Sequence, residues 1–583
     1  MPLIRMITKM IRIVIKRIIF IKLLLFLVII PVSAQAGQQD LQREVTLYNP
    51  YKPSLSLVQK RSYLPDMTDT AGIKPDFTYH IKTKPFYPEY TISQIRAASL
   101  LPDPLPRLYK SYVKLGIGNY ITPFGELSIT NERSKKGAVG FYARHFSTNG
   151  KVKLDNDEKV FAGYMDNDAS FFGKKFFRHS LLEGSLDFTQ KTRYAYGYAP
   201  SMSYSPDKKE IKLDYYNPGA NLSFSSTGLD STDFSWDLNV NYDFFYNTSD
   251  LYQHHAGFEG TMATILKGFY AGAGLGFDFY RPSDAVFEGS EYIASLSPFI
   301  NKSTQQWDFK AGFQLLLDKD TSDTPKYHFY PDVRFGFSIV PEYISFFTAL
   351  NGKLIVNAPQ NIIEQNPFII EDGTLFTLKN TSYPLIVSAG FKGNNGIGGT
   401  YLISGSYSFI DDMLFFSNMI YASFPPFLVQ GGNYFVPLTD DGELLQIHGE
   451  MTGSIKDQVT FNVNANWYKY TLSVTEFPWN KPDWDGNIGI NYNLRNKIIA
   501  GFDVTALGKR NLLVTYFHPL DGIILTKSEE PLHVNLNLGI EYRYTKILSF
   551  WLKINNISFN RYYEWAYYPS QRFIGLIGFT YSL

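Results

Sequence analysis

Strict alternation of apolar and polar residues is the feature that most limits how this chain can fold. In residues 459–470, VTFNVNANWYKY, every second side chain from Val459 to Trp467 is apolar or aromatic, and asparagine fills three of the positions between them. The stretches 234–244, 269–279 and 532–544 repeat this pattern. Because successive side chains of a β-strand point to opposite faces, each stretch predicts a strand with one apolar face and one polar face.

Two all-β architectures fit this alternation, a soluble sandwich and a closed transmembrane barrel. The stretches exceed the roughly 5 to 6 residues usual in soluble sheets and reach the roughly 9 to 11 that a tilted membrane strand needs. Aromatic residues gather near strand ends, at 242–246 and 467–470, as in the girdles that meet lipid headgroups. Short connections alternate with long ones, at 425–440, 507–530 and 558–570. We therefore predict an antiparallel transmembrane β-barrel with an even strand number, about 16 to 22.

The polar face of these strands predicts a wet lumen. In a bilayer every backbone group must be hydrogen-bonded within the protein, so a spanning sheet must close on itself and turn its apolar face to lipid. Asparagine is a poor strand former, and its repeated use on the other face indicates hydration. The candidate lumen-facing residues are Asn239, Asn241, Asp243, Asn462, Asn464, Asn466, Asn535, Asn537, Glu541 and Arg543.

The N-terminal residues have the layout of an export signal. A basic region up to Arg17 precedes the apolar run 23–32, and Ala34-Gln35-Ala36 is a small-residue cleavage site. A membrane anchor, the alternative, needs roughly 20 uninterrupted apolar residues. We expect a signal peptide at 1–36, cleaved near Ala36, and a short irregular, Pro- and Tyr-rich segment at 37–108 that is periplasmic or enters the lumen. The barrel then occupies 109–583, in the outer membrane of a Gram-negative bacterium.

Counting strands leaves one inconsistency. About 22 candidate strands fit between 109 and 583, but counting back from the C-terminus puts the long stretch 357–380 on the periplasmic side, where short turns are expected. Either LFTL, residues 375–378, adds a strand, or an upstream strand boundary is misplaced.

Composition and motifs give no case for chemistry. A net charge of +1 gives no electrostatic reason to expect nucleic acid as a partner, and the absence of cysteine excludes thiolate metal sites and cysteine nucleophiles. His179-Ser180 reads as a turn, and His254-His255 cannot share one face of a regular strand. The acidic stretches 154–159 and 164–170 read as solvated loops, with a divalent-ion site as the alternative. We predict that the chain is not an enzyme and has no catalytic, metal-binding or cofactor-binding residues.

The C-terminal region resembles that of TonB-dependent receptors. The resemblance rests on Asn555-Asn556-Ile557, on the aromatic run 561–565, on Tyr568-Pro569, and on Arg572 before the closing strand. The stretches 105–127 and 365–393 also resemble receptor barrels of this superfamily.

This resemblance implies an outer-membrane barrel through which a solute or ligand passes, as a receptor or a porin-like channel. Such receptors carry a TonB box and a globular plug before the barrel. Residues 37–108 show no TonB box and are shorter than a plug, so the chain resembles a receptor barrel that lacks a full plug domain.

A second function remains open, that of a non-catalytic accessory or structural subunit of an envelope assembly or secretion complex. The partners expected are outer-membrane lipid and the outer-membrane assembly machinery, with periplasmic or surface lipoproteins as further candidates. No cofactor and no nucleic acid is expected.

Overall fold

The computed structural model describes residues 110–583, except 132–133, 199–206, 228–233, 284–288, 321–323, 371–377, 397, 422–432, 457 and 519–521. The predicted signal peptide at 1–36 and the Pro- and Tyr-rich segment at 37–108 lie outside these described residues. Within the described ranges, no helix is long and apolar enough to cross a membrane.

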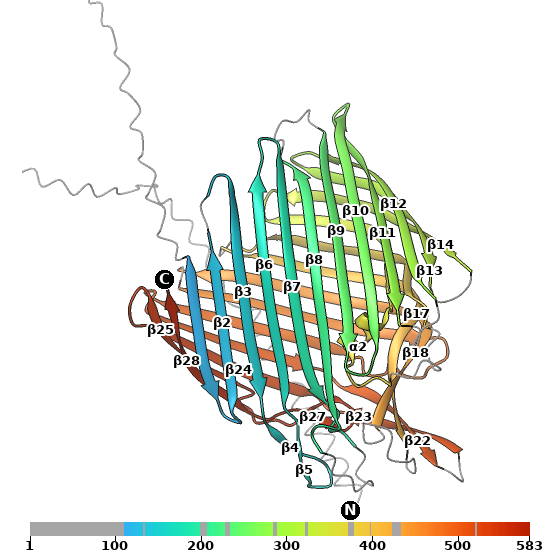
Figure 1. The fold of residues 1–583 in the computed structure, drawn as a ribbon. Coiled ribbons are helices and arrows are strands. Elements are labelled where there is room, and N and C mark those ends of the chain that lie inside the picture. Colours follow the sequence, from blue (N-terminus) through green and yellow to red (C-terminus); the bar gives the residue numbers. More distant parts are fainter. Residues whose placement is uncertain are drawn as a thin grey trace, which may run out of the picture. The chain divides into compact units, whose positions relative to one another are not determined.

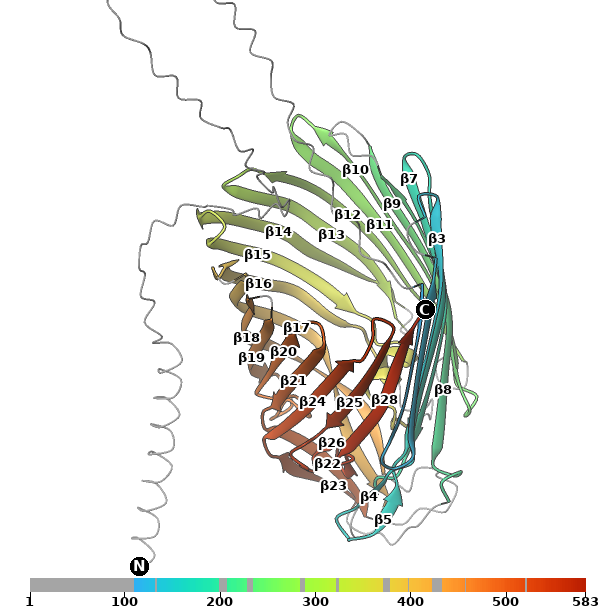
Figure 2. The ribbon, with the colours of Figure 1, turned by 90° about the vertical axis from the view of Figure 1, so that its left-hand side faces the viewer.

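Twenty-two antiparallel strands form a closed barrel (Figures 1 and 2). The wall strands are β1 (Ser111–Gly118), β2 (Thr122–Thr130), β3 (Gly137–Thr148), β6 (Tyr164–Phe176), β7 (Ser180–Tyr194), β8 (Lys212–Ser226), β9 (Ser235–Asn247), β10 (Tyr252–Leu266), β11 (Phe269–Pro282), β12 (Glu291–Ser303), β13 (Trp307–Lys319), β14 (Lys326–Val340), β15 (Ile344–Ile355), β16 (Thr381–Asn394), β17 (Thr400–Tyr421), β18 (Asn433–Ile455), β19 (Val459–Leu472), β20 (Trp484–Leu494), β21 (Ile498–Leu507), β24 (His533–Arg543), β25 (Leu548–Asn555) and β28 (Ile574–Ser582).

The barrel closes between its first and last strands. β28 pairs with β25 on one side and with β1 on the other, in a register from Tyr112↔Ser582 to Gly118↔Leu576. Closure gives every wall strand two neighbours, which is what a sheet in hydrocarbon requires. The predicted all-β barrel with an even number of strands is confirmed.

The remaining elements lie in the connections at one end of the barrel (Figure 1). They are the hairpin β4 (Lys151–Lys153) and β5 (Lys159–Phe161), the helix α2 (Pro359–Gln365), the hairpin β22 (Arg510–His518) and β23 (Gly522–Glu530), and the short pair β26 (Tyr563–Trp565) and β27 (Tyr568–Pro569). β21 pairs directly with β24, so the β22–β23 hairpin is not part of the wall. We call this end the loop end, and the other, which carries Ser111 and Leu583, the terminal end.

The predicted long connections 425–440, 507–530 and 558–570 all fall at the loop end, although the short connections 119–121 and 248–251 lie there too. The loop end also resolves the inconsistency in the strand count. The stretch 357–380 joins β15 to β16 and begins with α2. Nine wall strands follow it, β16 to β21, β24, β25 and β28. An odd number puts this stretch at the end opposite Leu583, with the other long connections.

Two predicted loops are wrong in part. The acidic stretch 164–170 belongs to strand β6. Its carboxylates Asp166 and Asp168 are accommodated there by ion pairs with arginines of the neighbouring strands. Residues 433–440 of the predicted loop 425–440 belong to β18, which pairs with the extended end of β17. Strands β17 and β18 continue beyond the length that a bilayer requires, and alternation in the sequence gives no reason to expect this extension.

The apolar face of the wall points away from the buried clusters. Leu186, Val240 and Ile577 are 61%, 48% and 63% exposed, although each lies in the middle of a hydrogen-bonded strand. A band of exposed large apolar side chains on a closed sheet is the surface that hydrocarbon covers. The largest buried cluster instead lies at the loop end.

Candidate functional site

A buried apolar cluster at the loop end joins connections that are far apart in sequence. We call it the lid cluster. Its members come from β8, β9, the β15–β16 connection, β17, β18, β22 and the last connection. They include Leu213, Tyr215, Phe245, Ile362, Ile363, Phe368, Leu414, Phe416, Tyr434, Phe435, Val514, Trp565, Ala566 and Tyr568.

The lid cluster extends across the barrel. It contacts β8 and β9 on one arc of the wall and β17 and β18 on another. Seven wall strands, β10 to β16, separate these arcs on one side, and eleven separate them on the other, β19 to β21, β24, β25, β28, β1 to β3, β6 and β7. A contiguous cluster that reaches both arcs must cross the lumen, so described parts of the loop-end connections extend over this end of the barrel.

Helix α2 and the residues after it form the middle of the lid cluster. The helix starts at Pro359, whose missing N–H costs nothing in the first turn. It ends before Asn366, whose side-chain oxygen accepts a hydrogen bond from the N–H of Phe368 at 3.0 Å. This turn directs Phe368 onto the ring of Tyr568, with ring centroids 3.9 Å apart and planes at 16°.

Hydrogen bonds attach this connection to both arcs. The hydroxyl of Tyr215 on β8 donates to the backbone oxygen of Pro367 at 2.6 Å. On the far arc, the N–H of Phe435 donates to the oxygen of Phe368, and the N–H of Ile370 donates to the oxygen of Phe435, both at 3.1 Å. Bonds of this kind satisfy backbone groups that apolar packing would otherwise leave without a hydrogen-bond partner.

A third attachment lies at the other end of the same connection. The Asn380 side-chain amide donates to Glu291 Oε1 at 2.5 Å and to Asp318 Oδ1 at 2.9 Å, and all three residues are buried. Asn380 directly precedes β16, whereas Glu291 and Asp318 belong to β12 and β13. One amide therefore holds the connection against two buried carboxyl groups of the wall.

The last connection supplies the other aromatic half of the cluster. Trp565 lies edge-on to Phe416 and Phe435, with centroids 5.3 and 5.2 Å away. Tyr568 is 1% exposed, and burial raises its pKa well above the ordinary value, so the phenol stays neutral. These residues belong to the motif that carries the resemblance to receptors.

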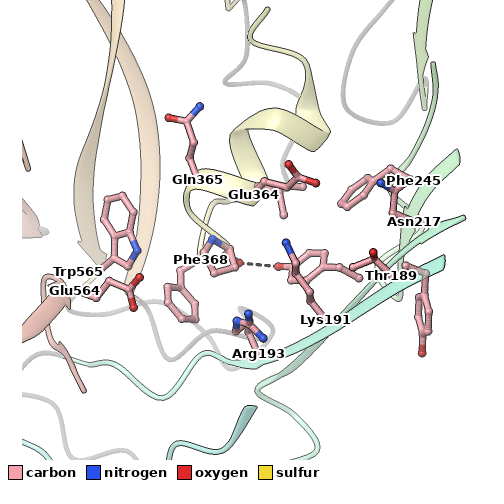
Figure 3. Close-up of a pocket in the computed structure, with 14 residues that line it drawn as sticks. Thr189, Lys191, Arg193, Asn217, Phe245, Glu364, Gln365, Phe368, Glu564 and Trp565 are labelled. Carbon is pink, nitrogen blue, oxygen red and sulfur yellow. Dashed lines mark hydrogen bonds between the residues drawn. The ribbon is translucent and has the colours of Figure 1, made fainter. Parts of the chain in front are cut away.

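A cavity of about 160 Å³ lies between the lid cluster and the wall (Figure 3). Lys191 and Arg193 of β7 line it from the wall, and Glu364 and Glu564 line it from two connections. Arg193 also forms an ion pair with Asp166 at 2.7 Å. The aromatic lining comes from Tyr215, Phe245, Phe368 and Trp565. Charges of both signs beside aromatic faces can hold a ligand that has both polar and apolar parts.

The predicted polar residues of β9 lie on the same strand face as Phe245 of the lid cluster. His255 of β10 lies between two carboxylates of the neighbouring strands. Its Nδ1 is 3.3 Å from Asp243 of β9, and its Nε2 is 3.0 Å from Asp278 of β11. Asn241 and Asn239 continue this face by alternation, and the Asn239 amide donates to Asp237 at 2.7 Å. His254 bonds to Tyr242 on the opposite face, as alternation predicts.

The three asparagines of β19 share a face with Tyr470, which packs against a buried cluster that includes Trp479 of the β19–β20 connection. The Asn466 side chain donates to Asp485 at 2.8 Å and accepts from Gln446 at 3.2 Å. Asn462 donates to Asn487 at 3.3 Å, and Asn464 lies between them on the same face.

The predicted residues of β24 share a face with His533, whose ring stacks on Tyr562 of the last connection at 3.9 Å. Asn537 accepts from the N–H of Asn556 at 3.0 Å, and Asn535 precedes it on this face. Glu541 and Arg543, further from the loop end, pair with each other at 3.4 Å.

None of the ten predicted residues lines the cavity. The sequence does not predict its polar lining, which consists of Thr189, Lys191, Arg193, Asn217, Glu364, Gln365 and Glu564. The alternation of Thr189, Lys191 and Arg193 is a signal that could have placed these three on one face. The two glutamates belong to connections, and nothing in the sequence predicts that those connections fold toward β7.

No group of three or more His, Asp or Glu side chains suited to a metal ion occurs in the described part of the chain. The acidic stretches singled out from the sequence instead pair with cations, Asp168 with Arg144 at 3.9 Å and Asp157 with Lys153 at 2.7 Å.

Comparisons with known proteins place the fold. No family model and no curated protein matches the sequence. Among solved structures, the FrpB iron transporter from Neisseria meningitidis is 11% identical with a TM-score of 0.60, covering 82% of each chain. The siderophore receptor PirA from Acinetobacter baumannii is 10% identical with a TM-score of 0.59, covering 81% of this chain and 80% of that one. The ferric-catecholate import receptor Fiu from E. coli K12 is 9% identical with a TM-score of 0.57, covering 82% of each. At these identities the likeness shows the fold, a barrel of the same architecture as these receptors.

Proposed function

We propose that this chain is an outer-membrane barrel that lets a solute or ligand cross the outer membrane of a Gram-negative bacterium through a gated lumen. The observation that carries the proposal is the lid cluster, which joins opposite arcs of the wall at the loop end. A wide barrel with an open lumen would need no such structure. A barrel that admits a ligand only on demand needs one that can rearrange.

The barrel's two ends give the orientation. Outer-membrane barrels have short turns on the periplasmic side and long loops outside. The loop end would therefore face the exterior, where the lid cluster meets an arriving ligand. The cavity beside Lys191 and Arg193 is our candidate for the first binding site, because it combines charged and aromatic surface.

The ten predicted polar residues would line the path beyond the lid. Asn, Asp, Glu and Arg side chains can exchange hydrogen bonds with a passing polar solute as they do with water. Asp243, Asn466 and Asn535 lie nearest the lid in their strands, and Arg543 lies nearest the terminal end. We also retain the proposal that residues 37–108 stand in place of a full plug.

The decisive experiment compares a locked lid with a loosened one. Ile369 of the β15–β16 connection forms a parallel bridge with Phe435 of β18, so the two backbones are adjacent. Because the chain contains no cysteine, Ile369→Cys with Phe435→Cys introduces a single pair that can form a disulfide. Each single-cysteine variant serves as its control.

The loosened lid is Asn380→Asp. An ionised aspartate cannot donate to Glu291 or Asp318, and it repels both, so the attachment is lost at a cost of about 3 kcal/mol. Asn496→Asp, in the turn between β20 and β21, makes the same change of charge at the terminal end and is the matched control.

Planar-bilayer conductance gives the result. We expect rare openings in the native barrel, none in the oxidised cysteine pair, their return with reductant, and several-fold more frequent openings in Asn380→Asp. Heat-modifiable gel mobility checks that each variant is folded. If no variant conducts, the barrel is blocked and the accessory role in an envelope complex replaces transport. Equal conductance in all of them would show that the lid does not gate.

A further inference from the structure

A second cavity at the loop end is lined by five cationic side chains and no carboxylate. Its volume is about 190 Å³, and it lies between the β4–β5 hairpin, the turn after β1 and the last connection. Its charged lining consists of Lys151, Lys153, Lys159, Arg561 and Arg572. Tyr120, Val152, Pro569 and Ser570 complete it.

The hairpin is amphipathic, which directs its lysines to this cavity. Val152 of β4 and Leu154 after it are buried, 7% and 3% exposed, and pack with Ala162 and Tyr198. Because strand side chains alternate, Lys151 and Lys153 lie on the other face. Lys159 is the backbone neighbour of Lys153 on the opposite strand of the hairpin, so it lies on this face too. The apolar face fixes the hairpin, and the cationic face lines the cavity.

The three segments are held together by side-chain hydrogen bonds. The Gln571 amide donates to the oxygen of Ala162 at 2.7 Å and thereby joins the base of the hairpin to the last connection. The Tyr196 hydroxyl donates to the oxygen of Pro569 at 2.9 Å. Asn119, beside Tyr120, donates to the oxygen of Phe573 at 2.9 Å and accepts from the N–H of Gly575 at 2.9 Å. The cavity is therefore a built feature.

Carboxylates outside the cavity neutralise only part of this charge. Arg561 pairs with Asp155 at 2.5 Å, and Lys153 pairs with Asp157 at 2.7 Å. Lys151, Lys159 and Arg572 form no ion pair with any described residue. The Nε–H of Arg561 is buried and has no hydrogen-bond partner among those residues. An unmet donor beside three uncompensated cations favours an anion with several acceptor oxygens.

We propose that this cavity binds a phosphate-bearing group. The guanidinium groups of Arg561 and Arg572 would donate to its oxygens, and Lys151 and Lys159 would supply charge. At the outer rim of a barrel, the phosphate can come from lipopolysaccharide of the surrounding leaflet or from a free phosphorylated solute. The proposal requires the barrel and its loop end but not transport.

The test uses the full barrel and two probes. Inorganic pyrophosphate is titrated against the barrel in detergent micelles. Lipopolysaccharide, intact or enzymatically dephosphorylated, is titrated into liposomes that contain the barrel. The variant is Lys151→Gln with Arg572→Gln, since neither side chain holds a structural contact. The control, Lys135→Gln with Lys136→Gln in the turn between β2 and β3, removes the same charge at the terminal end.

We expect the cavity variant to bind at least tenfold more weakly and the control variant less than twofold more weakly. Loss in the pyrophosphate arm alone identifies a free anion, loss in the lipopolysaccharide arm alone identifies the lipid headgroup, and loss in both identifies the shared chemistry. Binding in neither arm, equal weakening by both variants, or equal affinity for dephosphorylated lipopolysaccharide without pyrophosphate binding overturns the proposal. Conductance should be unchanged in the cavity variant, which separates this result from failure of the gating proposal.

Discussion

The two ends of the barrel are made by the same strands but are finished differently. At the terminal end, β10 passes into β11 through Lys267-Gly268, both with positive φ, 50° and 79°. This is the tight turn that matches the twist of a hairpin, and it needs nothing from the rest of the chain. At the loop end, the β15–β16 connection is held by β8, β12, β13 and β18.

The difference separates local from distant causes. A tight turn is decided by the conformational freedom of two residues, so the terminal end follows from short sequence windows. The lid cluster exists only because the closed wall brings together residues more than 300 positions apart, such as Phe245 and Tyr568. The lid therefore requires the wall, whereas we expect the wall to form without the loop-end elements that lie outside it.

The largest effect should come from breaking the wall itself. Deleting residues 571–583 removes β28, leaving β1 and β25 without a partner and with open edges in hydrocarbon. We expect no folded barrel in the outer membrane, measured by heat-modifiable gel mobility of membrane fractions.

The matched control removes a longer piece of the loop end. Replacing residues 509–531 by a short Gly-Ser linker deletes the β22–β23 hairpin, but β21 still pairs with β24 from Leu507↔His533 onward. This variant should reach the outer membrane. Normal assembly of the first variant would contradict the need for closure by β28. Failure of the second would contradict the claim that the wall forms without the β22–β23 hairpin.

A smaller effect distinguishes the two faces of one strand. Val240 lies in the middle of β9 and is 48% exposed, and Asn239 lies beside it on the opposite face of the strand. Val240→Arg should lower the free energy of unfolding by about 2–4 kcal/mol, because a charge would enter hydrocarbon.

Asn239→Ser loses one part-buried hydrogen bond to Asp237 and should cost about 0.5 kcal/mol. Urea titration in liposomes measures both variants. Equal losses would mean that the outer face of β9 does not meet lipid.

The sequence predicted the wall because alternation reports a strand's two environments directly. The stretches 234–244, 459–470 and 532–544 fall within or at the edges of β9, β19 and β24. Alternation failed at 164–170, where Asp166 and Asp168 resemble a loop until their cationic partners on other strands are known.

The candidate site could not be predicted in the same way. Residues 365–370 and 561–568 were noticed only as parts of motifs, and neither stretch reveals that Phe368 stacks on Tyr568. The cavity depends on that contact, since it brings Glu364 and Glu564 to the wall beside Lys191. Long-range packing of this kind has no periodic signal in a single sequence.

A small effect is expected for the proton on Glu530, which lies at the loop end. Glu530 faces Arg510 across the β22–β23 hairpin. Arg510 is 7% exposed and donates to Asn480 at 2.8 Å and to the oxygen of Glu564 at 3.2 Å, so the hairpin is docked on the last connection. Burial raises the pKa of Glu530 to about 7, although Arg510 opposes the shift.

Because this pKa is raised above the ordinary 4.5, the docked hairpin holds a proton that a released hairpin would give up. The contribution to docking is full below pH 4.5 and is lost as the pH rises through about 7. Partial exposure limits it to roughly 1 kcal/mol or less.

Hydrogen exchange of β22 amides, corrected for intrinsic rates, should therefore be about threefold slower at low than at high pH. Glu530→Gln should remove this difference, whereas Glu529→Gln, which loses only an exposed pair with Lys509, should keep it. Protection that grows with pH would show that the carboxylate, and not the neutral acid, stabilises the docked hairpin.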